Sequence, residues 1–326
     1  MASGSPPREA PRGAPAAPPS RPSDTAGHRP PGGRPPGIAL PGPGAPPASG
    51  PPNTLRPVKL LLIRHGQSSN NVLTAAGHAF AGRSADPLLT ALGRTQARRL
   101  AQAFADGLLP RPQVLLCSPM VRAVQTSVPV SEELDVPVEL LTDAYEVGGL
   151  YGGPPSAPVA ERGAGASALR EVNERVVVPV DVDDDGWYDK GEYVEAPAQA
   201  QGRGFALFAD LERRFHADDR VVGLICHEWI IQYLLRASMG AASVQGAPDP
   251  WVTMLNTATA HLETGLPAPE PYEGAGETVI HWINRFDHLP PDERTHWERP
   301  GRRRAGARLP PTGGRLGDHP VSIFIT

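Results

Sequence analysis

The chain has 326 residues, of which 40% are hydrophobic, and a formal net charge of −4. That length supports one domain of ordinary size with terminal extensions. No run of 18 apolar residues occurs and no apolar leader opens the sequence, so neither a membrane span nor a signal peptide is expected. We therefore expect a cytoplasmic protein with no membrane partner.

Residues 1–56 differ in composition from the rest of the chain. They hold 17 of its 40 prolines, together with glycine, alanine and arginine. Such a segment buries too little apolar surface to offset the entropy of ordering it, so we expect disorder. The expected organisation is a disordered segment over 1–56, one globular domain over 57–290, and a basic, Pro/Gly-rich tail over 291–326.

The first predicted strand covers residues 58–63 and runs directly into Arg64 and His65. Polar side chains at the carboxyl end of a buried strand lie where open α/β sheets bind ligands. Gly66 lets the backbone approach a ligand closely or adopt a positive φ. The hydroxyl and amide groups of residues 68–71 fall where a helix would begin. A cation, an imidazole, bare backbone and small donors together suit a phosphate group.

A second strand and helix follow a similar plan. A strand is expected over 113–117, with an apolar run from Val114 to Cys117, and Ser118 is expected to cap a helix over 119–128 with Pro119 in its first position. Arg122 would then lie one turn into this helix. From there its guanidinium can reach back toward the strand ends.

Residues 142–202 interrupt the alternation of strands and helices. We expect this excursion to lie over the active edge of the sheet, the usual place of substrate-selecting loops. Within it, residues 181–192 match the EF-hand loop pattern at the ligand positions and the glycine. However, a run ending at Pro179 stands where the entering helix should be, and Tyr188 replaces the usual aliphatic residue. We interpret the segment as an acidic surface loop rather than a calcium site.

A third apolar strand, over 221–226, ends at His227 and brings a second imidazole to the same edge as His65. Glu228 follows directly. A carboxylate that points into a phosphate pocket would repel the ligand, whereas an outward one favours the dipole of the following helix. We expect the outward orientation.

The remaining elements complete an alternating pattern. Strands are expected over 137–141, 257–263 and 278–286, and helices over 90–105, 203–216 and 229–239. This order predicts an α/β fold, a three-layer α/β/α sandwich with a largely parallel central sheet.

Three further features carry weaker information. Cys117 and Cys226 fall at expected strand ends and are interpreted as buried, reduced thiols. The arginine-rich stretch from Arg294 to Arg315 is expected to be a solvated tail rather than a nucleic-acid-binding one. Residues 321–325 could return as an edge strand or lie free.

Several blocks, in chain order, resemble the histidine phosphatase superfamily of phosphoglycerate-mutase-like proteins. They are the Arg-His-Gly-Gln-Ser run from Arg64 with Asn71 behind it, the Asp-Pro-Leu-Leu-Thr run from Asp86, the Ser-Pro-x-x-Arg-Ala-x-Gln-Thr run from Ser118, His227 at its strand end, the Asn-Thr pair at Asn256, and the final strand leading to Leu289. The likeness spans Val58 to Leu289 and implies a phosphoglycerate-mutase-like fold. The usual small residue after the second histidine is replaced by Glu228.

The resemblance implies a reaction and assigns roles to five residues. His65 would be the nucleophile that forms a phosphohistidine, and His227 would lie beside it in the catalytic site. Arg64, Arg122 and Asn71 would bind the phosphate. The superfamily's reaction needs no metal and no cofactor.

The general acid is less clearly marked. Glu146 follows the third strand and precedes flexible glycines, as the family's acidic residue does. A partly shielded carboxyl there would have a raised pKa, which suits a proton donor near neutrality. The spacing of the glycines differs from the form expected in the family, so Asp143 stays as a rival.

These observations favour a phosphatase that hydrolyses a small phosphorylated metabolite through a phosphohistidine. A phosphoglycerate-type mutase of the same family is one alternative. The other is a non-catalytic scaffold that binds phospho-ligands, with Pro-rich termini docking onto partner domains. The sequence identifies no particular substrate and leaves homo-oligomerisation open.

Overall fold

The computed structural model describes residues 57–76, 82–153, 158–188, 194–216, 218–241, 251–267 and 276–296. The predictions made for residues 1–56 and 321–325, and for most of the basic tail, lie outside the described residues. Within the described ranges, no helix combines the length and the apolarity needed to cross a bilayer.

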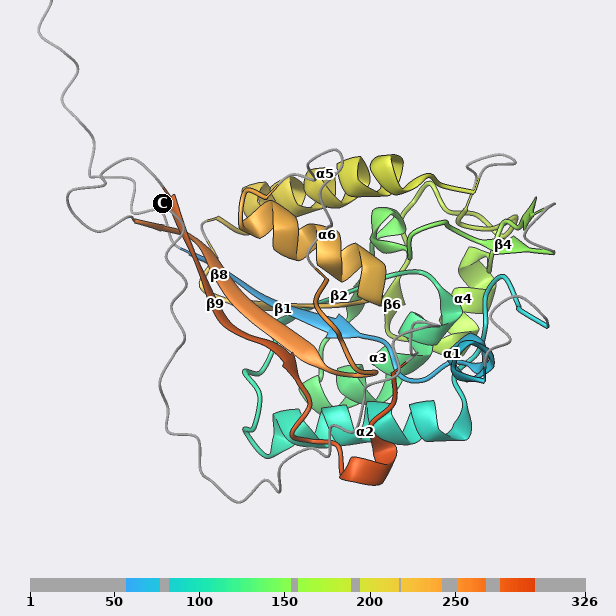
Figure 1. Cartoon of the computed structure of the whole chain (residues 1–326), viewed down its shortest axis with the longest axis horizontal. Helices are drawn as coiled ribbons and strands as arrows, with labels where there is room; N and C mark the ends of the chain where they lie inside the picture. The colour runs from blue at the N-terminus through green and yellow to red at the C-terminus, as the bar shows by residue number, and fades with distance from the viewer. Residues whose placement is uncertain are drawn as a thin grey trace, which may run out of the picture. The chain divides into compact units, whose positions relative to one another are not determined.

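A seven-stranded sheet forms the centre of the domain (Figure 1). Its strands are β1 (Val58–Arg64), β2 (Val114–Cys117), β3 (Val138–Leu140), β6 (Val176–Val177), β7 (Val221–Cys226), β8 (Thr259–Pro267) and β9 (Gly276–Arg285). They lie in the order β6-β3-β2-β7-β1-β8-β9, and the first five are parallel to one another. Strand β8 is antiparallel to β1, and β9 is antiparallel to β8. The predicted, largely parallel sheet is confirmed.

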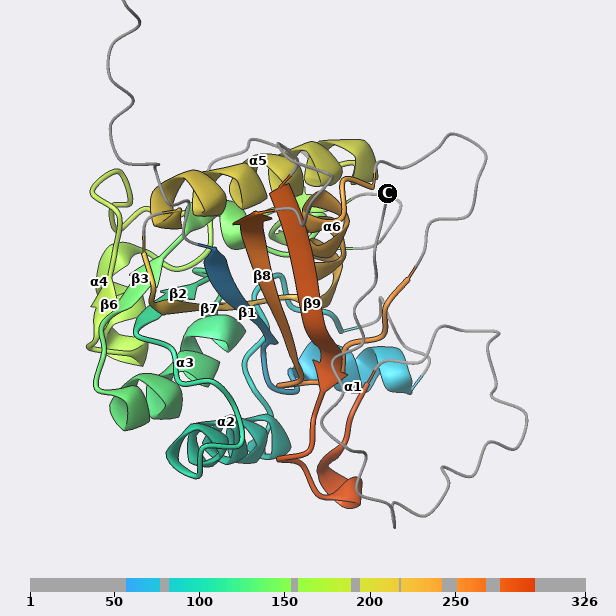
Figure 2. The same ribbon diagram turned by 90° about the vertical axis from the view of Figure 1, so that its left-hand side faces the viewer.

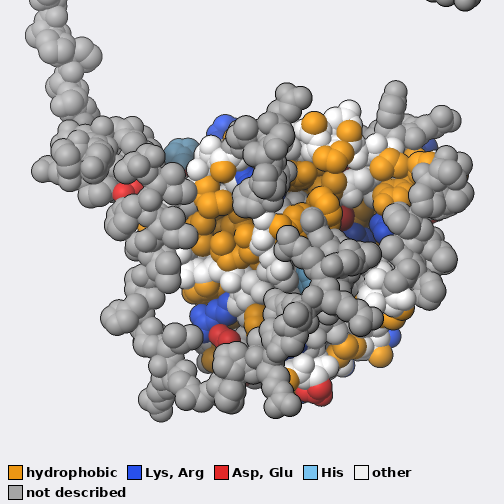
Figure 3. All heavy atoms as spheres, viewed as in Figure 1, with side chains coloured by type: hydrophobic (Ala, Val, Ile, Leu, Met, Phe, Trp, Pro, Cys, Tyr) orange, Lys and Arg blue, Asp and Glu red, His pale blue; other side chains and the backbone are white. Residues whose placement is uncertain are grey.

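Helices cover both faces of this sheet. They are α1 (Ser69–Ala75), α2 (Ala91–Ala105), α3 (Val121–Leu134), α4 (Ala166–Val172), α5 (Pro197–Phe215) and α6 (Glu228–Ser238), with 3-10 turns η1 (Thr142–Ala144) and η2 (Pro291–Glu293). Helices α2, α3 and α4 contribute to the hydrophobic core on one face, and α5 and α6 to the core on the other. In the face that Figure 3 shows, hydrophobic side chains gather in the upper half, where α6 and β8 lie. The three-layer α/β/α arrangement is therefore confirmed.

Strand β1 is the structural origin of the candidate site. Its apolar run Leu60 to Ile63 is at most 1% exposed, because both faces of the sheet are covered at this position. Each of these side chains contributes about 1.5–3 kcal/mol by being removed from water. The strand therefore fixes the position of the residues at its carboxyl end.

Gly66 and Gly93 let the loop after β1 pack against the start of α2. A Cβ on either glycine would collide with backbone atoms of the other segment, namely Gly93 in one case and Gln67 in the other. Gly66 does not have a positive φ. Gly66 therefore lacks a side chain because the start of α2 packs directly against its backbone. The sequence alone did not indicate this reason.

The predicted start of helix α3 is wrong. The helix begins at Val121 with Met120 as its N-cap, instead of beginning at Pro119 after a Ser118 cap. The Ser118 hydroxyl instead lies 2.8 Å from Nε2 of His227. A long-range contact with a buried imidazole has replaced the local cap.

The excursion over 142–202 contains more regular structure than its loop-like sequence indicates. It holds η1, a small ribbon of β4 (Tyr151–Gly152) and β5 (Val159–Ala160), and helix α4. It also supplies β6 to the main sheet and the first turns of α5. The element directly before the acidic loop is strand β6, and not the entering helix of an EF-hand. Asp184 accepts hydrogen bonds from the backbone and hydroxyl of Ser167.

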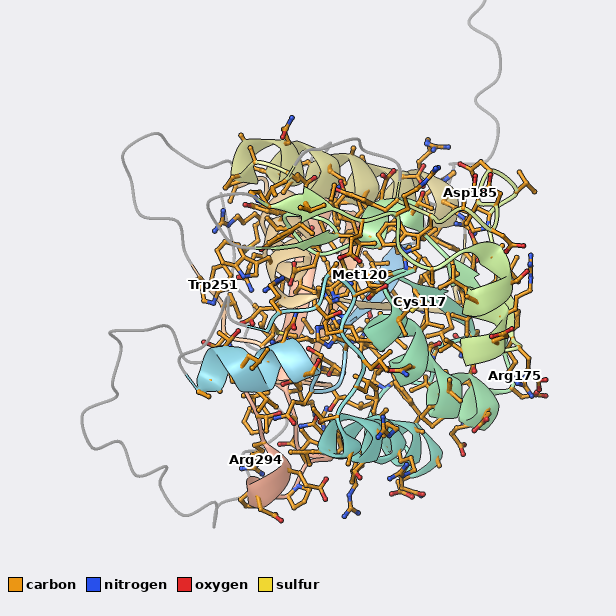
Figure 4. All side chains as sticks on the ribbon, turned by 90° about the vertical axis from the view of Figure 1, so that its right-hand side faces the viewer. Cys117, Met120, Arg175, Asp185, Trp251 and Arg294 are labelled. Carbon is orange, nitrogen blue, oxygen red and sulfur yellow. The ribbon has the colours of Figure 1, made fainter. Side chains whose placement is uncertain are left out.

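Figure 4 contrasts this peripheral loop with the interior. Asp185 lies at the outside of the domain, whereas Cys117 and Met120 lie near its middle. Cys117 and Cys226 are both free and buried, in agreement with their interpretation as core thiols.

Candidate active site

His65 stands immediately after β1, where its backbone N–H donates to the carbonyl of Cys226 on β7. Its Nδ1 lies 2.6 Å from the carbonyl oxygen of Gly66. A carbonyl can only accept, so we assign the ring proton to Nδ1, which leaves a lone pair on Nε2. Burial, followed by the charges of Arg122 and Arg64, holds the pKa of His65 well below its usual value. The imidazole is therefore neutral at pH 7.

Arg122 approaches this ring from helix α3. Its Nε donates to Nε2 of His65 over 3.2 Å, and its Nη1 lies 3.8 Å from Oδ1 of Asp86. Burial lowers the pKa of Arg122 to about 10, which leaves the guanidinium charged at neutral pH. A buried cation thus faces the nitrogen that carries the free lone pair.

His227 brings a second imidazole from the end of β7. The centroids of the His65 and His227 rings are 5.0 Å apart. The Met120 N–H donates to the Ser118 hydroxyl, and the hydroxyl in turn lies 2.8 Å from Nε2 of His227. When the hydroxyl donates its own proton to Nε2, the ring proton of His227 is on Nδ1. This Nδ1 is buried and has no hydrogen-bond partner among the described residues. Burial, and next the charge of Arg122, lower the pKa of His227.

Arg64, the last residue of β1, is already paired. It is 1% exposed, and its Nη1 lies 3.2 Å from Oε2 of Glu228 and donates to the carbonyl of Met254. Its Nε has no hydrogen-bond partner among the described residues. Most of this cation's charge is thus balanced inside the protein.

The predicted outward orientation of Glu228 is wrong. This side chain is 1% exposed, and its Oε1 lies 2.7 Å from Nε2 of His296. An exposed carboxylate at a helix N-terminus gains about 0.3–1 kcal/mol from the dipole. A buried Arg64 without a counter-ion would cost several kcal/mol, so the ion pair determines the orientation.

Glu146 lies against the N-terminus of helix α6. Its carboxylate accepts from the backbone N–H of Val147 at 2.9 Å, Ile230 at 3.3 Å and Trp229 at 3.4 Å. Burial raises the pKa of Glu146, while the charge of Arg122 and the backbone N–H groups of Val147 and Trp229 oppose the rise. Asp143, the rival, is exposed to solvent within η1.

Asn71 belongs to the wall of the site. Its Oδ1 accepts from the backbone N–H of Ser68 at 3.0 Å and from Nδ2 of Asn256 at 3.3 Å. Asn256 also donates to the carbonyl oxygen of His65 and accepts from the hydroxyl of Thr295. The amide oxygen of Asn71 therefore orders the loop after β1, through hydrogen bonds to Ser68 and Asn256.

A family model described as the histidine phosphatase superfamily (branch 1) matches residues 60–264. The chain belongs to this superfamily. The match begins within β1 and includes His65, Arg122, Glu146 and His227 of the site described above.

This member of the superfamily is also similar to several solved structures at low identity. One is a protein titled mycobacterial hydrolase 1, with 22% identity over 71% of this chain and 99% of that chain and a TM-score of 0.45. A second is a mycobacterial glucosyl-3-phosphoglycerate phosphatase, with 20% identity over 70% of this chain and 99% of that chain and a TM-score of 0.44. A third is a phosphoserine phosphatase mutant from Entamoeba histolytica in complex with phosphoserine, with 18% identity over 72% of this chain and 100% of that chain and a TM-score of 0.44. No curated protein matches the chain.

Two polar residues of the candidate active site were missed by sequence reasoning. Asp86 accepts from the backbone N–H of Val121 at 3.0 Å and lies beside Arg122, and burial raises its pKa to about 6. Ser118 contacts His227 instead of capping α3. Both lie in blocks that carried the family resemblance, which was the available signal.

Proposed function

We propose that the chain is a phosphatase that hydrolyses a small phosphomonoester through a phosphohistidine on His65. The observation that carries the proposal is the hydrogen bond from Nδ1 of His65 to Gly66, which directs the lone pair of Nε2 toward Arg122. A neutral imidazole can attack phosphorus without first losing a proton.

In the first step, Nε2 of His65 forms a bond to phosphorus while the ester P–O bond breaks. Arg122 and the Nδ1–H of His227 stabilise the charge on the phosphoryl oxygens, since preorganised donors in a buried site need no reorganisation. The leaving alkoxide takes the proton of Glu146, whose pKa is raised by burial.

In the second step, water attacks the phosphohistidine. The Glu146 carboxylate accepts a proton from that water, the P–N bond breaks, and inorganic phosphate leaves with His65 regenerated. Arg64 can contribute to phosphate binding only by sharing its charge with Glu228. We therefore expect the pocket to bind free phosphate weakly.

A screen of phosphorylated metabolites in the presence of a metal chelator tests the proposal, with release of inorganic phosphate as the readout. We expect His65→Ala to abolish turnover, whereas His216→Ala, a change at an exposed histidine, keeps it. A substrate-derived phosphoryl label on the wild type should be acid-labile and base-stable. Phosphate release by His65→Ala would rule out His65 as the nucleophile. Transfer of the label to an acceptor metabolite instead of water would indicate a mutase.

A further inference from the structure

Strands β8 and β9 carry a second cluster of imidazole and carboxylate groups. His261 and Glu263 alternate along β8 and therefore share one face of the sheet, and His281 comes from β9. One ligand atom from each of the three residues lies within 4.8 Å of those from the other two. Figure 2 shows β8 and β9 side by side, with β9 outermost.

An irregularity in β9 brings the third member of the cluster to this face. The register runs from His261 opposite Trp282 to Leu262 opposite Ile280, which leaves His281 as an extra residue. Such a bulge re-aims a side chain that would otherwise alternate to the opposite face. As a result, the rings of both His281 and Trp282 contact His261, with centroid distances of 4.6 Å and 4.8 Å.

His261 is the observation that points to a ligand. It is 7% exposed, yet neither of its ring nitrogens has a hydrogen-bond partner among the described residues. The nearby indole N–H of Trp282 donates instead to the Thr259 hydroxyl at 3.0 Å. Buried polar groups in proteins are nearly always satisfied, so two unpaired nitrogens on one buried imidazole are unusual.

We propose that His261, Glu263 and His281 bind a divalent transition-metal ion of the Zn²⁺ type, with water completing the coordination. Two imidazoles and one carboxylate match the donors that Zn²⁺ takes in three-ligand sites, whereas Ca²⁺ and Mg²⁺ prefer oxygen ligands. Bonds of about 2.0–2.2 Å place tetrahedral ligands roughly 3.3 Å apart. Small side-chain movements would therefore close the site around the ion.

The surroundings are compatible with a bound cation. Glu263 supplies a negative charge and already lies 3.2 Å from Nε2 of His281. Lys59 stands opposite Glu263 on β1, but its ammonium donates to the backbone carbonyl of Asp219.

This site is separate from the candidate active site. His261 pairs with Leu61, four residues before His65 on the same run of chain, a span of about 13 Å at the rise of a strand. The ion would fasten β9 to β8, because His281 belongs to β9 and the other two ligands to β8. We therefore infer a structural role at the edge of the sheet.

Zn²⁺ titration of the chelator-treated full chain, followed by calorimetry and by thermal unfolding, tests the inference. We expect one equivalent to bind and the Tm to rise, and Co²⁺ in place of Zn²⁺ to give visible bands of a four-coordinate ion. His281→Gln should weaken binding at least tenfold. His216→Gln, at an exposed site, and His65→Ala, in the phosphate pocket, should keep the wild-type affinity.

Glu263→Gln is the second ligand variant, and it carries the test if His281→Gln does not fold. Both side chains are partly exposed, so thermal unfolding in chelator should give the wild-type Tm. Absence of Zn²⁺ binding by the wild type, or wild-type affinity in a folded ligand variant, would overturn the proposal. Loss of binding in His65→Ala alone would assign the ion to the phosphate pocket instead.

Discussion

Replacing Glu228 with glutamine should lower stability and strengthen phosphate binding at the same time. The substitution keeps the shape of the side chain and removes the counter-ion of Arg64. At the 3.2 Å separation of the charged atoms, the Coulomb energy is about 5 kcal/mol for an effective dielectric constant of 20. Removing one partner of a buried ion pair costs about 3–5 kcal/mol. We therefore expect the Tm of Glu228→Gln to fall by roughly 10 °C.

The ligand response distinguishes this effect from simple damage to the fold. In Glu228→Gln a phosphate dianion becomes the available counter-ion of Arg64, so its inhibition constant should fall about tenfold, or ~1.4 kcal/mol. Phosphate should also raise the Tm of the variant more than that of the wild type. Phosphate inhibition of turnover and thermal unfolding with and without phosphate measure both effects.

Two further variants make the test specific. Glu174→Gln removes an exposed carboxylate and should change neither quantity. Arg64→Gln combined with Glu228→Gln should be more stable than the sum of the single variants indicates, because the two residues are coupled. A Glu228→Gln protein with wild-type stability and wild-type phosphate inhibition would refute the ion pair as the determinant of this pocket.

The remaining predictions concern pH, packing and charge. The pKa of His227 is lowered in the folded state, so below pH 6.5 the imidazole takes up a proton in the unfolded state but not in the folded one. Between pH 7.5 and 5.5 the free energy of unfolding should therefore fall by about 1.4 kcal/mol more in the wild type than in His227→Gln, as measured by denaturant unfolding. Equal falls in the two proteins would contradict the lowered pKa. Gly93→Ala should lower the free energy of unfolding by about 1–3 kcal/mol, because its Cβ would collide with the backbone of Gln67. Gly202→Ala, in an open part of α5, should raise the same quantity by about 0.5–1 kcal/mol. An unchanged stability of Gly93→Ala would argue against the close approach of Gly93 to Gln67. Asp86→Asn should lower kcat/KM about tenfold by releasing Arg122 from its partner, and an unchanged value would show that Arg122 is held by other contacts.

The sheet and its main helices could be predicted because their signals are local. Strand β7 was predicted to the residue, since a short continuous apolar run between polar residues is typical of a parallel strand buried on both faces. The meeting of His65 and His227 followed from two strands that end at the same edge. The extra turns of α3 were not expected, because Pro129 lies inside the helix where a break is the usual outcome.

The orientation of Glu228 could not be predicted in this way. The dipole of helix α6 favoured a solvent-exposed carboxylate. The partners that determine its orientation, Arg64 and His296, come from distant parts of the sequence. The role of Ser118 was hidden for the same reason, since its contact with His227 depends on how β2 and β7 pair. The extra residue in β9 that re-aims His281 is likewise visible only once the register of β8 and β9 is known.

The short stretch around η2 has a practical consequence for anyone who trims this chain. Glu293 and Thr295 accept hydrogen bonds from the Gln96 amide, and His296 contacts Glu228, although all three lie beyond the last residue of the family match. A truncation at Leu289, where the motif resemblance in the sequence ends, would leave Gln96, Asn256 and Glu228 without these partners. Expression boundaries for crystallisation or screening should therefore extend past His296, because a shorter chain lacks contacts that order the candidate active site.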